Sequence, residues 1–266
     1  MLPDVLQFAF MQRALFGGLV IAVLLGWVGV YATSRNMSFV GAGVAHASLA
    51  AVALAILVGW SPLITVIIFS ILLGTLLYVL DTRTSVSRDT AIGILFSAGM
   101  AVGILLLQFH DGYVPELMSF LFGTILSITQ IDIIIVASIG TVMMLFLFLL
   151  RRELLYITVD PDGAYLSGMN RTAVELFLYI STSLAVVISI KLVGIVLVSA
   201  LLVLPAAIAK SFATSFSLFV RYAICFSIFM VIFGLVLSFY ADLPSGASIV
   251  LLGTVFFLSA RLLTMK

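Results

Sequence analysis

The stretch RRELLYITVDPDGAYLSGMNR, residues Arg151–Arg171, is the longest polar interruption in an otherwise apolar chain. It carries three of the twelve basic residues and three of the eleven acidic ones. Pro161 and Gly163 favour a turn in its middle. The sequence on either side has the composition of lipid-embedded segments. We therefore expect a membrane domain whose one sizeable polar loop, residues 151–171, contacts a partner outside the membrane.

The composition excludes a soluble domain. Of the 266 residues, 64% are hydrophobic and 9% charged, and the mean hydropathy is +1.37, whereas globular chains carry roughly 25% charged residues. The single cysteine, Cys225, lies in an apolar run, so one chain can form neither a disulfide nor a thiolate metal site. We expect no cleavable signal peptide, because the first residues lack a basic start and the apolar run from Ala14 is too long for one. We expect no nucleic-acid partner.

Short polar breaks separate nine apolar segments that are long enough to cross a membrane, since a span needs ~20 apolar residues. They are residues 14–32, 39–58, 63–80, 90–108, 131–150, 172–190, 193–209, 216–239 and 247–263. The fold class is therefore an all-α polytopic membrane protein with about nine transmembrane helices. Eight crossings remain possible if residues 193–209 do not fully cross. Residues 117–128 are too short to cross and predict a re-entrant or surface segment. No linker divides the chain, so residues 1–266 predict a single transmembrane domain.

The basic residues predict the orientation, because cytoplasmic loops are enriched in Lys and Arg. If loop 151–171 is cytoplasmic and nine spans alternate, ten of the twelve basic residues lie at the inner face. Only Arg13 and Lys191 then lie at the outer face. The N-terminus is predicted outside and the C-terminus in the cytoplasm.

His46 is the most informative single side chain. It lies in GAGVAHASLAAVALA, residues 41–55, a segment rich in small residues that let helices approach closely or leave room for an ion. An ionisable group inside a span is a functional-site hypothesis by default, and neutral imidazole suits zinc, copper, nickel or iron. The alternative is a histidine hydrogen-bonded to a neighbouring backbone carbonyl. One histidine alone does not make a metal site, because zinc takes four ligands.

Other charged residues have simpler explanations. His110, Asp111 and Glu116 cluster in an outer loop, where they could attract a cation or form an ordinary solvated loop. Asp132 and Glu175 lie at the ends of spans, where solvation at the membrane interface accounts for them.

A second group of residues predicts structural roles first and gating roles second. Pro205, near the inner end of its span, removes a backbone hydrogen bond and is expected to kink or end the helix. Asp242, Pro244 and Gly246 form an outer turn before the last span.

Enzymatic activity is not predicted. The chain has no Gly-rich phosphate-binding loop with Lys-Ser/Thr, no Ser/His/Asp or Cys/His arrangement, and no intramembrane protease motif. A stand-alone secondary transporter or channel would need several acidic groups at mid-span for ion coupling, and the sequence has almost none. A membrane scaffold without transport activity is left open by composition.

Several segments, in order along nearly the whole chain, resemble the permease subunits of zinc/manganese/iron ABC importers. They are MSFVGAGVAHASLAAVALA (37–55), RDTAIGILFSAGMAVGILL (88–106), FLFGTIL (120–126), DPDGAYLSGMN (160–170), KLVGIVLVSALLVLPAAIAK (191–210) and DLPSGASIVLL (242–252). The resemblance implies a type II-like ABC importer permease in a prokaryotic inner or plasma membrane. It implies a second copy of this chain, two cytoplasmic ATPase subunits and an extracytoplasmic metal-binding protein. ATP hydrolysis would occur in a separate chain.

The resemblance also bears on the transported ion. It implies no cofactor bound by this chain and a divalent metal ion, zinc first and manganese or iron as alternatives, as transported substrate. Many family members carry an acidic residue one helical turn before the histidine, but here that position is Ala42. The context Ala-His-Ala-Ser-Leu is more similar to the zinc branch.

Within loop 151–171 the residues predict a short helix from Pro161 or Asp162 to Gly168. Asp160 suits the N-cap, Pro161 the first helical position, Asp162 the positive end of the helix dipole, and Gly168 the end. Ala164 would leave a gap, while Tyr165, Leu166 and Met169 would offer an apolar face to a groove on a partner. The resemblance implies that this helix couples the permease to its ATPase. The alternative is an amphipathic surface helix without a partner.

Overall fold

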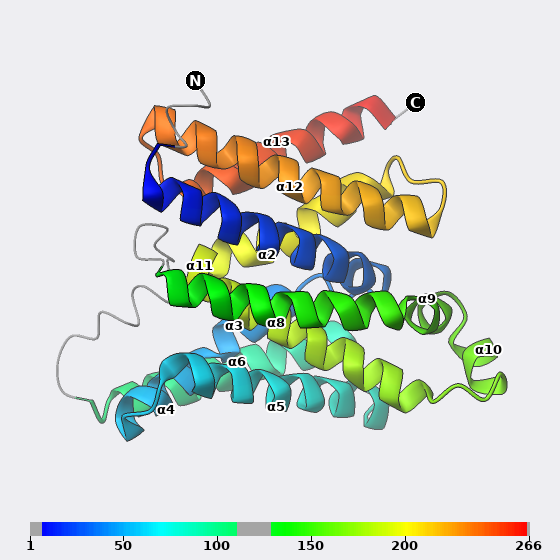
Figure 1. Cartoon of the computed structure of the whole chain (residues 1–266). Coiled ribbons are helices and arrows are strands. Elements are labelled where there is room, and N and C mark those ends of the chain that lie inside the picture. Colours follow the sequence, from blue (N-terminus) through cyan, green and yellow to red (C-terminus); the bar gives the residue numbers. More distant parts are fainter. Residues whose placement is uncertain (1–6, 111–128, 265–266) are drawn as a thin grey trace.

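The computed structural model describes residues 7–110 and 129–264, and the regular secondary structure in them is helical (Figure 1). The helices are α2 (Ala9–Ser34), α3 (Val40–Ala47), α4 (Leu49–Val58), α5 (Pro62–Arg83), α6 (Arg88–Leu107), α8 (Gln130–Leu149), α9 (Arg151–Val159), α10 (Pro161–Leu166), α11 (Arg171–Lys210), α12 (Phe216–Ala241) and α13 (Ser245–Thr264). Among these residues, eight helices are long and apolar enough to cross a membrane, with α3 and α4 together forming one of them. The predicted all-α membrane fold is confirmed.

Local capping residues explain where several helices begin. Pro62 stands in the first turn of α5, where its missing N–H costs nothing. The side chains of Ser87, Asn170 and Ser215 each accept a hydrogen bond from a backbone N–H in the first turn of α6, α11 and α12. At α8, Thr129 and Asp132 form a reciprocal capping box.

The chain reverses direction within α11, at Gly194. Its φ of 78° and ψ of 167° lie in a region that is essentially accessible to glycine only. The sequence placed the break between two spans at Lys191, and this was wrong by three residues. Lys191 lies within the helix, and its ammonium group forms an ion pair with the carboxylate of Asp132 in α8.

The neighbours of α11 along α2 show the reversal. Near its beginning, Glu175 contacts Arg35 at the C-terminal end of α2. Further along, Leu192 lies against Gly17, near the N-terminal end of α2. The first part of α11 therefore runs antiparallel to α2 over its length.

The second part of α11 runs back toward the C-terminal end of α2. The backbone carbonyl of Leu202 lies against Gly29, in the C-terminal half of α2, so closely that any side chain at Gly29 would collide with it. Seven of the eight candidate helices run through the bundle once, and α11 runs through it twice. The part of the chain that the structure describes therefore makes nine passes through the bundle. Figure 1 shows both parts of α11 inside the bundle, with the turn between them on the left.

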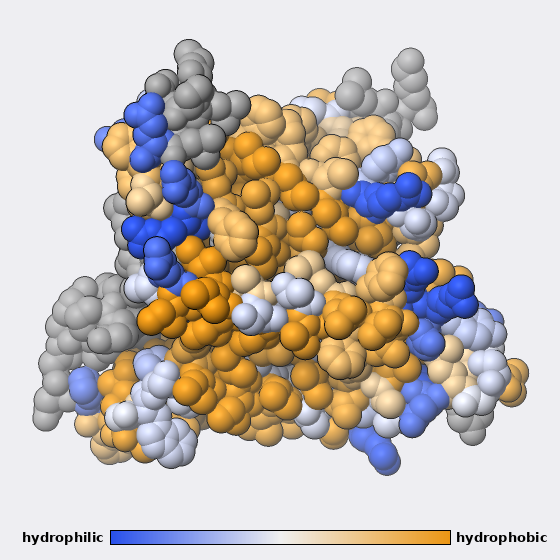
Figure 2. Space-filling view, in the orientation of Figure 1, coloured by the Kyte–Doolittle hydropathy of each residue, from blue (hydrophilic) through white to orange (hydrophobic). Residues whose placement is uncertain are grey.

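The core lies around α2, α11 and the α3–α4 pair, whereas α6 and α13 are the most exposed of the candidate spans. Apolar side chains cover the middle of the molecule, and hydrophilic side chains gather at its two ends (Figure 2). Helices α9 and α10 and the C-terminal end of α13 lie at one end, on the right of Figure 1, and the beginning of α2 lies at the other. We call the end with α9 and α10 the loop end.

The predicted non-crossing segment, residues 117–128, lies outside the described residues. Helix α9 was not predicted: loop 151–171 was expected to contain a single short helix. Its apolar residues Leu154 and Ile157 are fully buried against the bundle, while Arg151 and Arg152 are exposed. The guanidinium of Arg151 lies 4.3 Å from the centre of the Phe148 ring, a cation–π contact at the junction with α8.

Candidate translocation and coupling sites

His46 lies near the end of α3, one residue before the break between α3 and α4. Its ring is half-buried and meets the ring of Phe96 in α6 edge-on, with centroids 5.0 Å apart. In residues 7–110 and 129–264 no hydrogen bond to either imidazole nitrogen is present. The alternative of a backbone-bonded histidine therefore finds no partner there.

The open face of α3 carries both His46 and Ala42. These two residues are half-buried, and every other residue of α3 is buried. They are four positions apart, which places them one above the other on a helix. Ala42 and His46 therefore share a face of α3, and a side chain longer than alanine at position 42 would lie next to the imidazole.

Helix α6 packs tightly on α3 and α4 through glycine residues. A Cβ at Gly43 would collide with Ile92, and Cβ atoms at Gly99 and Gly103 would collide with Ala47 and with the region of Leu49. These close approaches hold Phe96 beside His46. Small residues at such contacts are typical of helix pairs in membranes.

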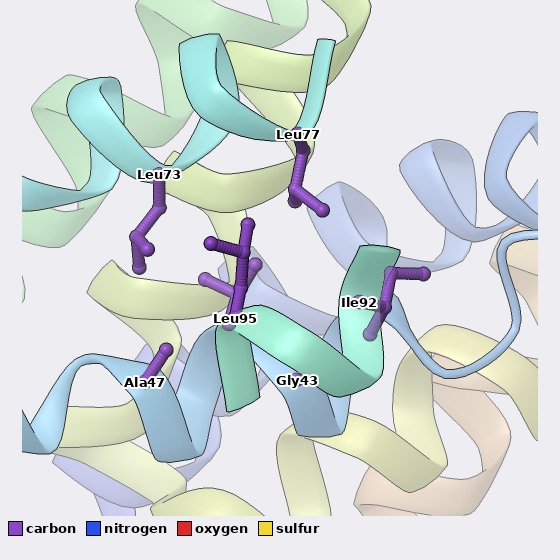
Figure 3. Close-up of a pocket in the computed structure, with 7 residues that line it drawn as sticks. Gly43, Ala47, Leu73, Leu77, Ile92 and Leu95 are labelled. Atoms are coloured by element: carbon purple, nitrogen blue, oxygen red, sulfur yellow. The ribbon is translucent and has the colours of Figure 1, made fainter. Parts of the chain in front are cut away.

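Beside His46, the space between α3, α5 and α6 is apolar and filled. Figure 3 shows Leu73 and Leu77 of α5 directed toward Leu95 of α6, with Gly43 and Ala47 of α3 below them. Water-sized space is absent and no polar atom lines this crevice. In the described part of the chain, no three metal-ligating side chains come together, so His46 would need donors from elsewhere to hold an ion.

The outer-loop cluster stays a prediction. His110 is exposed just after α6, and Asp111 and Glu116 lie outside the described residues.

Pro205 is buried inside α11, which continues to Lys210. The proline therefore does not end the helix, which was one of the two expected outcomes. Asp242 has a φ of 51° and ends α12 in a left-handed conformation, which confirms the predicted turn. Gly246 was expected in the same turn, but it is the second residue of α13, where the backbone N–H of Ser248 donates a hydrogen bond to the carbonyl of Pro244.

Asp132 and Glu175 are not solvated at the interface, and this expectation was wrong. Asp132 is 6% exposed and Glu175 3% exposed. Asp132 is paired with Lys191 and also caps α8. A buried charge requires a partner, and each of these acids has found one on another helix.

Glu175 is the centre of a buried ion pair at the loop end. Its Oε1 lies 2.7 Å from Nη2 of Arg35, which is itself 6% exposed, and 3.2 Å from Nε of Arg171. Sequence reasoning missed this group. The spacing of Arg171 and Glu175, one helical turn apart, was the signal available; the partner at Arg35 is 140 residues away.

Helix α10 forms where the predicted coupling helix was expected. Asp160 caps it, with Oδ1 accepting from the backbone N–H of Gly163 at 2.9 Å. Pro161 is its first residue and Asp162 lies in its first turn. Gly168, with φ 78°, follows in the left-handed conformation expected of a helix end. A Cβ at Gly163 would collide with the Asp160 carboxylate and displace it from this capping position.

The face of α10 differs from the prediction at one position. Ala164 is fully buried in the core cluster, so it leaves no gap toward a partner. Leu166 is 84% exposed, and Met169 is partly buried against the core. The side chains of Pro161 and Tyr165 lie outside what the structure describes. The exposed apolar residues of α9 and α10 are Tyr156, Val159 and Leu166.

Known proteins resemble the chain over nearly its full length. The sequence pattern of the ABC 3 transport family matches residues 7–264. The chain is 31% identical over 254 residues to the manganese transport system membrane protein MntC of Halalkalibacterium halodurans, covering 96% of this chain and 87% of that protein. It is 31% identical over 246 residues to the high-affinity zinc uptake system membrane protein ZnuB of Haemophilus influenzae, covering 92% and 94%.

A solved structure agrees with the sequence comparisons. PsaBC from Streptococcus pneumoniae, determined in complex with Fab, aligns with a TM-score of 0.85 at 29% identity, over 98% of this chain and 95% of that chain. The family pattern covers every helix of the fold, including the α3, α10 and α11 segments that carry the candidate sites. The chain therefore belongs to the ABC 3 transport family and is one of its membrane permeases.

Proposed function

We propose that this chain is the permease subunit of an ATP-driven importer of divalent metal ions, with zinc as the first candidate. The observation that carries the proposal is the position of His46, a half-buried imidazole with no hydrogen bond from the described residues, on the open face of a membrane-spanning helix. Relatives that cover nearly the whole chain are named for zinc and for manganese transport.

Zinc is favoured over manganese by the donor chemistry on α3. Imidazole suits zinc, whereas manganese prefers carboxylate, carbonyl and water oxygens. Position 42, which shares the open face with His46, is alanine and supplies no carboxylate. Manganese remains the second candidate because of the relatives named for it.

The proposed partners follow from what the chain lacks and from its family. It has no phosphate-binding loop, so ATP hydrolysis is assigned to two cytoplasmic ATPase subunits that dock at α10. A second copy of this chain would complete the permease, and an extracytoplasmic metal-binding protein would deliver the ion. Residues 1–266 would form one transmembrane permease domain in the plasma membrane of a prokaryote.

The function is tested in proteoliposomes that contain the permease with its ATPase, with the metal-binding protein outside. We expect uptake of radioactive zinc that requires ATP, exceeds uptake of radioactive manganese at limiting metal, and is absent when the ATPase is omitted. A faster uptake of manganese would select the second candidate. Uptake by the permease alone, driven by a proton or sodium gradient, would show a secondary transporter instead.

The proposed orientation places the loop end in the cytoplasm. At that end lie the exposed arginines Arg83, Arg151 and Arg152, in agreement with the enrichment of basic residues on the cytoplasmic side. With Cys225 replaced by alanine, we expect Ser85→Cys to be protected from an impermeant thiol reagent in intact cells and Leu243→Cys to react. Both positions are exposed, so accessibility reports the side of the membrane. The reverse pattern would invert the topology.

A further inference from the structure

At the loop end, a series of hydrogen bonds runs from Glu175 to Tyr179. Both residues lie on α11, so this helix closes the series into a ring. Glu175 accepts from Arg35 at 2.7 Å, and the backbone carbonyl of Arg35 accepts from Nη1 of Arg88 at 2.8 Å. Nε of Arg88 lies 2.9 and 3.0 Å from the two oxygens of Asp81. Asp81 in turn accepts from the hydroxyl of Tyr179 at 2.5 Å, one helical turn after Glu175. The ring thereby joins the ends of α2 and α5 to the beginnings of α6 and α11.

A short connection with hydrogen bonds at both of its ends joins the ring to α10. Only residues 167–170 separate α10 from Arg171, the first residue of α11. Asn170 caps α11 by accepting from the backbone N–H of Ala173 at 3.1 Å. Arg171 lies 3.2 Å from Glu175, and on the α10 side the hydroxyl of Ser167 donates to the carbonyl of Ala164 at 2.8 Å. A displacement of α10 therefore acts directly on Glu175.

On its other side, the ring is attached to His46 through α6. Arg88 is the first residue of this helix. One turn later Ile92 packs against Gly43 of α3, and after a second turn Phe96 meets the His46 ring at 5.0 Å. These three residues of α6 lie on one face of a continuous helix. A displacement of Arg88 therefore also displaces Phe96, which contacts the His46 ring.

We propose that Arg35 and Glu175 are positioning residues that transmit the movement of α10 to His46, through Arg88 and Phe96 of α6. The inference rests on the proposed function, because it assumes that α10 moves with an ATPase and that His46 lies on the ion path. The pair suits this task because both charges are buried, and separating a buried ion pair is strongly destabilising since it leaves an uncompensated buried charge. Solvated charges at a membrane surface would separate under the same displacement.

The test measures metal ions imported per ATP hydrolysed, in proteoliposomes with ATPase and binding protein. Glu175→Gln removes the charge with little change in shape. We expect ATP hydrolysis to persist and the ratio of metal to ATP to fall about two- to thirty-fold, the range found for residues in coupling networks. Arg83→Gln is the matched control, since Arg83 is an exposed charge at the same end and has no ion pair among the described residues. It should keep the wild-type ratio.

A second variant covers the case in which Glu175→Gln does not fold. Phe96→Leu keeps an apolar side chain at a half-buried position but removes the ring from His46, and it should lower the ratio without altering the hydrogen-bonded ring. Combined with Glu175→Gln it should add little, because both residues would act on the same coupling step, whereas independent sites would give additive effects. A wild-type ratio in Phe96→Leu, or full additivity in the double variant, overturns the inference. Failure of the wild-type complex to import any metal would instead overturn the proposed function beneath it.

Discussion

Replacing His46 by alanine is expected to lower divalent-metal uptake at limiting metal about ten-fold or more, since even residues that only support a metal ligand contribute that much. The imidazole is the only histidine side chain in the candidate spans, and no hydrogen bond ties it to the described residues. Its loss therefore removes a metal donor without leaving a polar partner unsatisfied. The structural cost is confined to the edge contact with Phe96, about 0.5–1.5 kcal/mol for an aromatic pair.

The measurement is uptake of radioactive zinc, with ATPase pull-down as a check on assembly. Pull-down should match the wild type, because α3, which carries His46, lies within the bundle, whereas α10 lies at the loop end (Figure 1). Normal uptake at limiting metal would return His46 to an ordinary packing role. Ala42→Asp is the complementary variant: it places a carboxylate on the same open face one turn before His46 and should shift preference toward manganese.

Most of the helical architecture could be predicted from the sequence because each span had to satisfy its backbone within an apolar run of sufficient length. The predicted spans 63–80 and 131–150 correspond to α5 and α8 within a few residues at each end. The exception is α11, where a lysine looked like a break. Lys191 lies inside that helix, and its partner Asp132, 59 residues earlier, is brought to it only in the folded chain.

The charged groups were the least predictable part of the fold. Arg35 and Glu175 lie beside polar breaks, where solvation is the simplest expectation, yet the packing of α2 against α11 removes both from water. Sequence spacing identifies a pair within one helix, such as Arg171 and Glu175. It contains no signal for partners on different helices, whose distance is set by tertiary packing.

Helix α10 shows the same difference between local and tertiary information. The positions of Asp160, Pro161 and Gly168 were predicted from capping and turn chemistry, which depend on neighbouring residues alone. The inward orientation of Ala164 was not, because α9, which packs beside α10, was itself not predicted. A bulky residue at Ala164 would disturb the core, so it would not be a clean test of docking.

Leu166→Asp is therefore the sharper test of α10 as the coupling element. Leu166 is 84% exposed, so the permease should fold and insert normally. We expect ATPase affinity to weaken about thirty-fold, the equivalent of the ~2 kcal/mol that an apolar anchor contributes to an interface, with metal uptake falling in proportion. The measurement is binding of the purified ATPase to the permease in detergent, followed by uptake in proteoliposomes.

A matched control is available in Leu262→Asp, because Leu262 is 74% exposed at the same end of the bundle but on α13. Both variants add one negative charge and remove the same side chain. If general charge repulsion weakened the ATPase, the two would behave alike, whereas docking at α10 predicts that Leu166→Asp alone loses affinity. Wild-type binding and transport in Leu166→Asp would contradict docking through the exposed Leu166 side chain of α10.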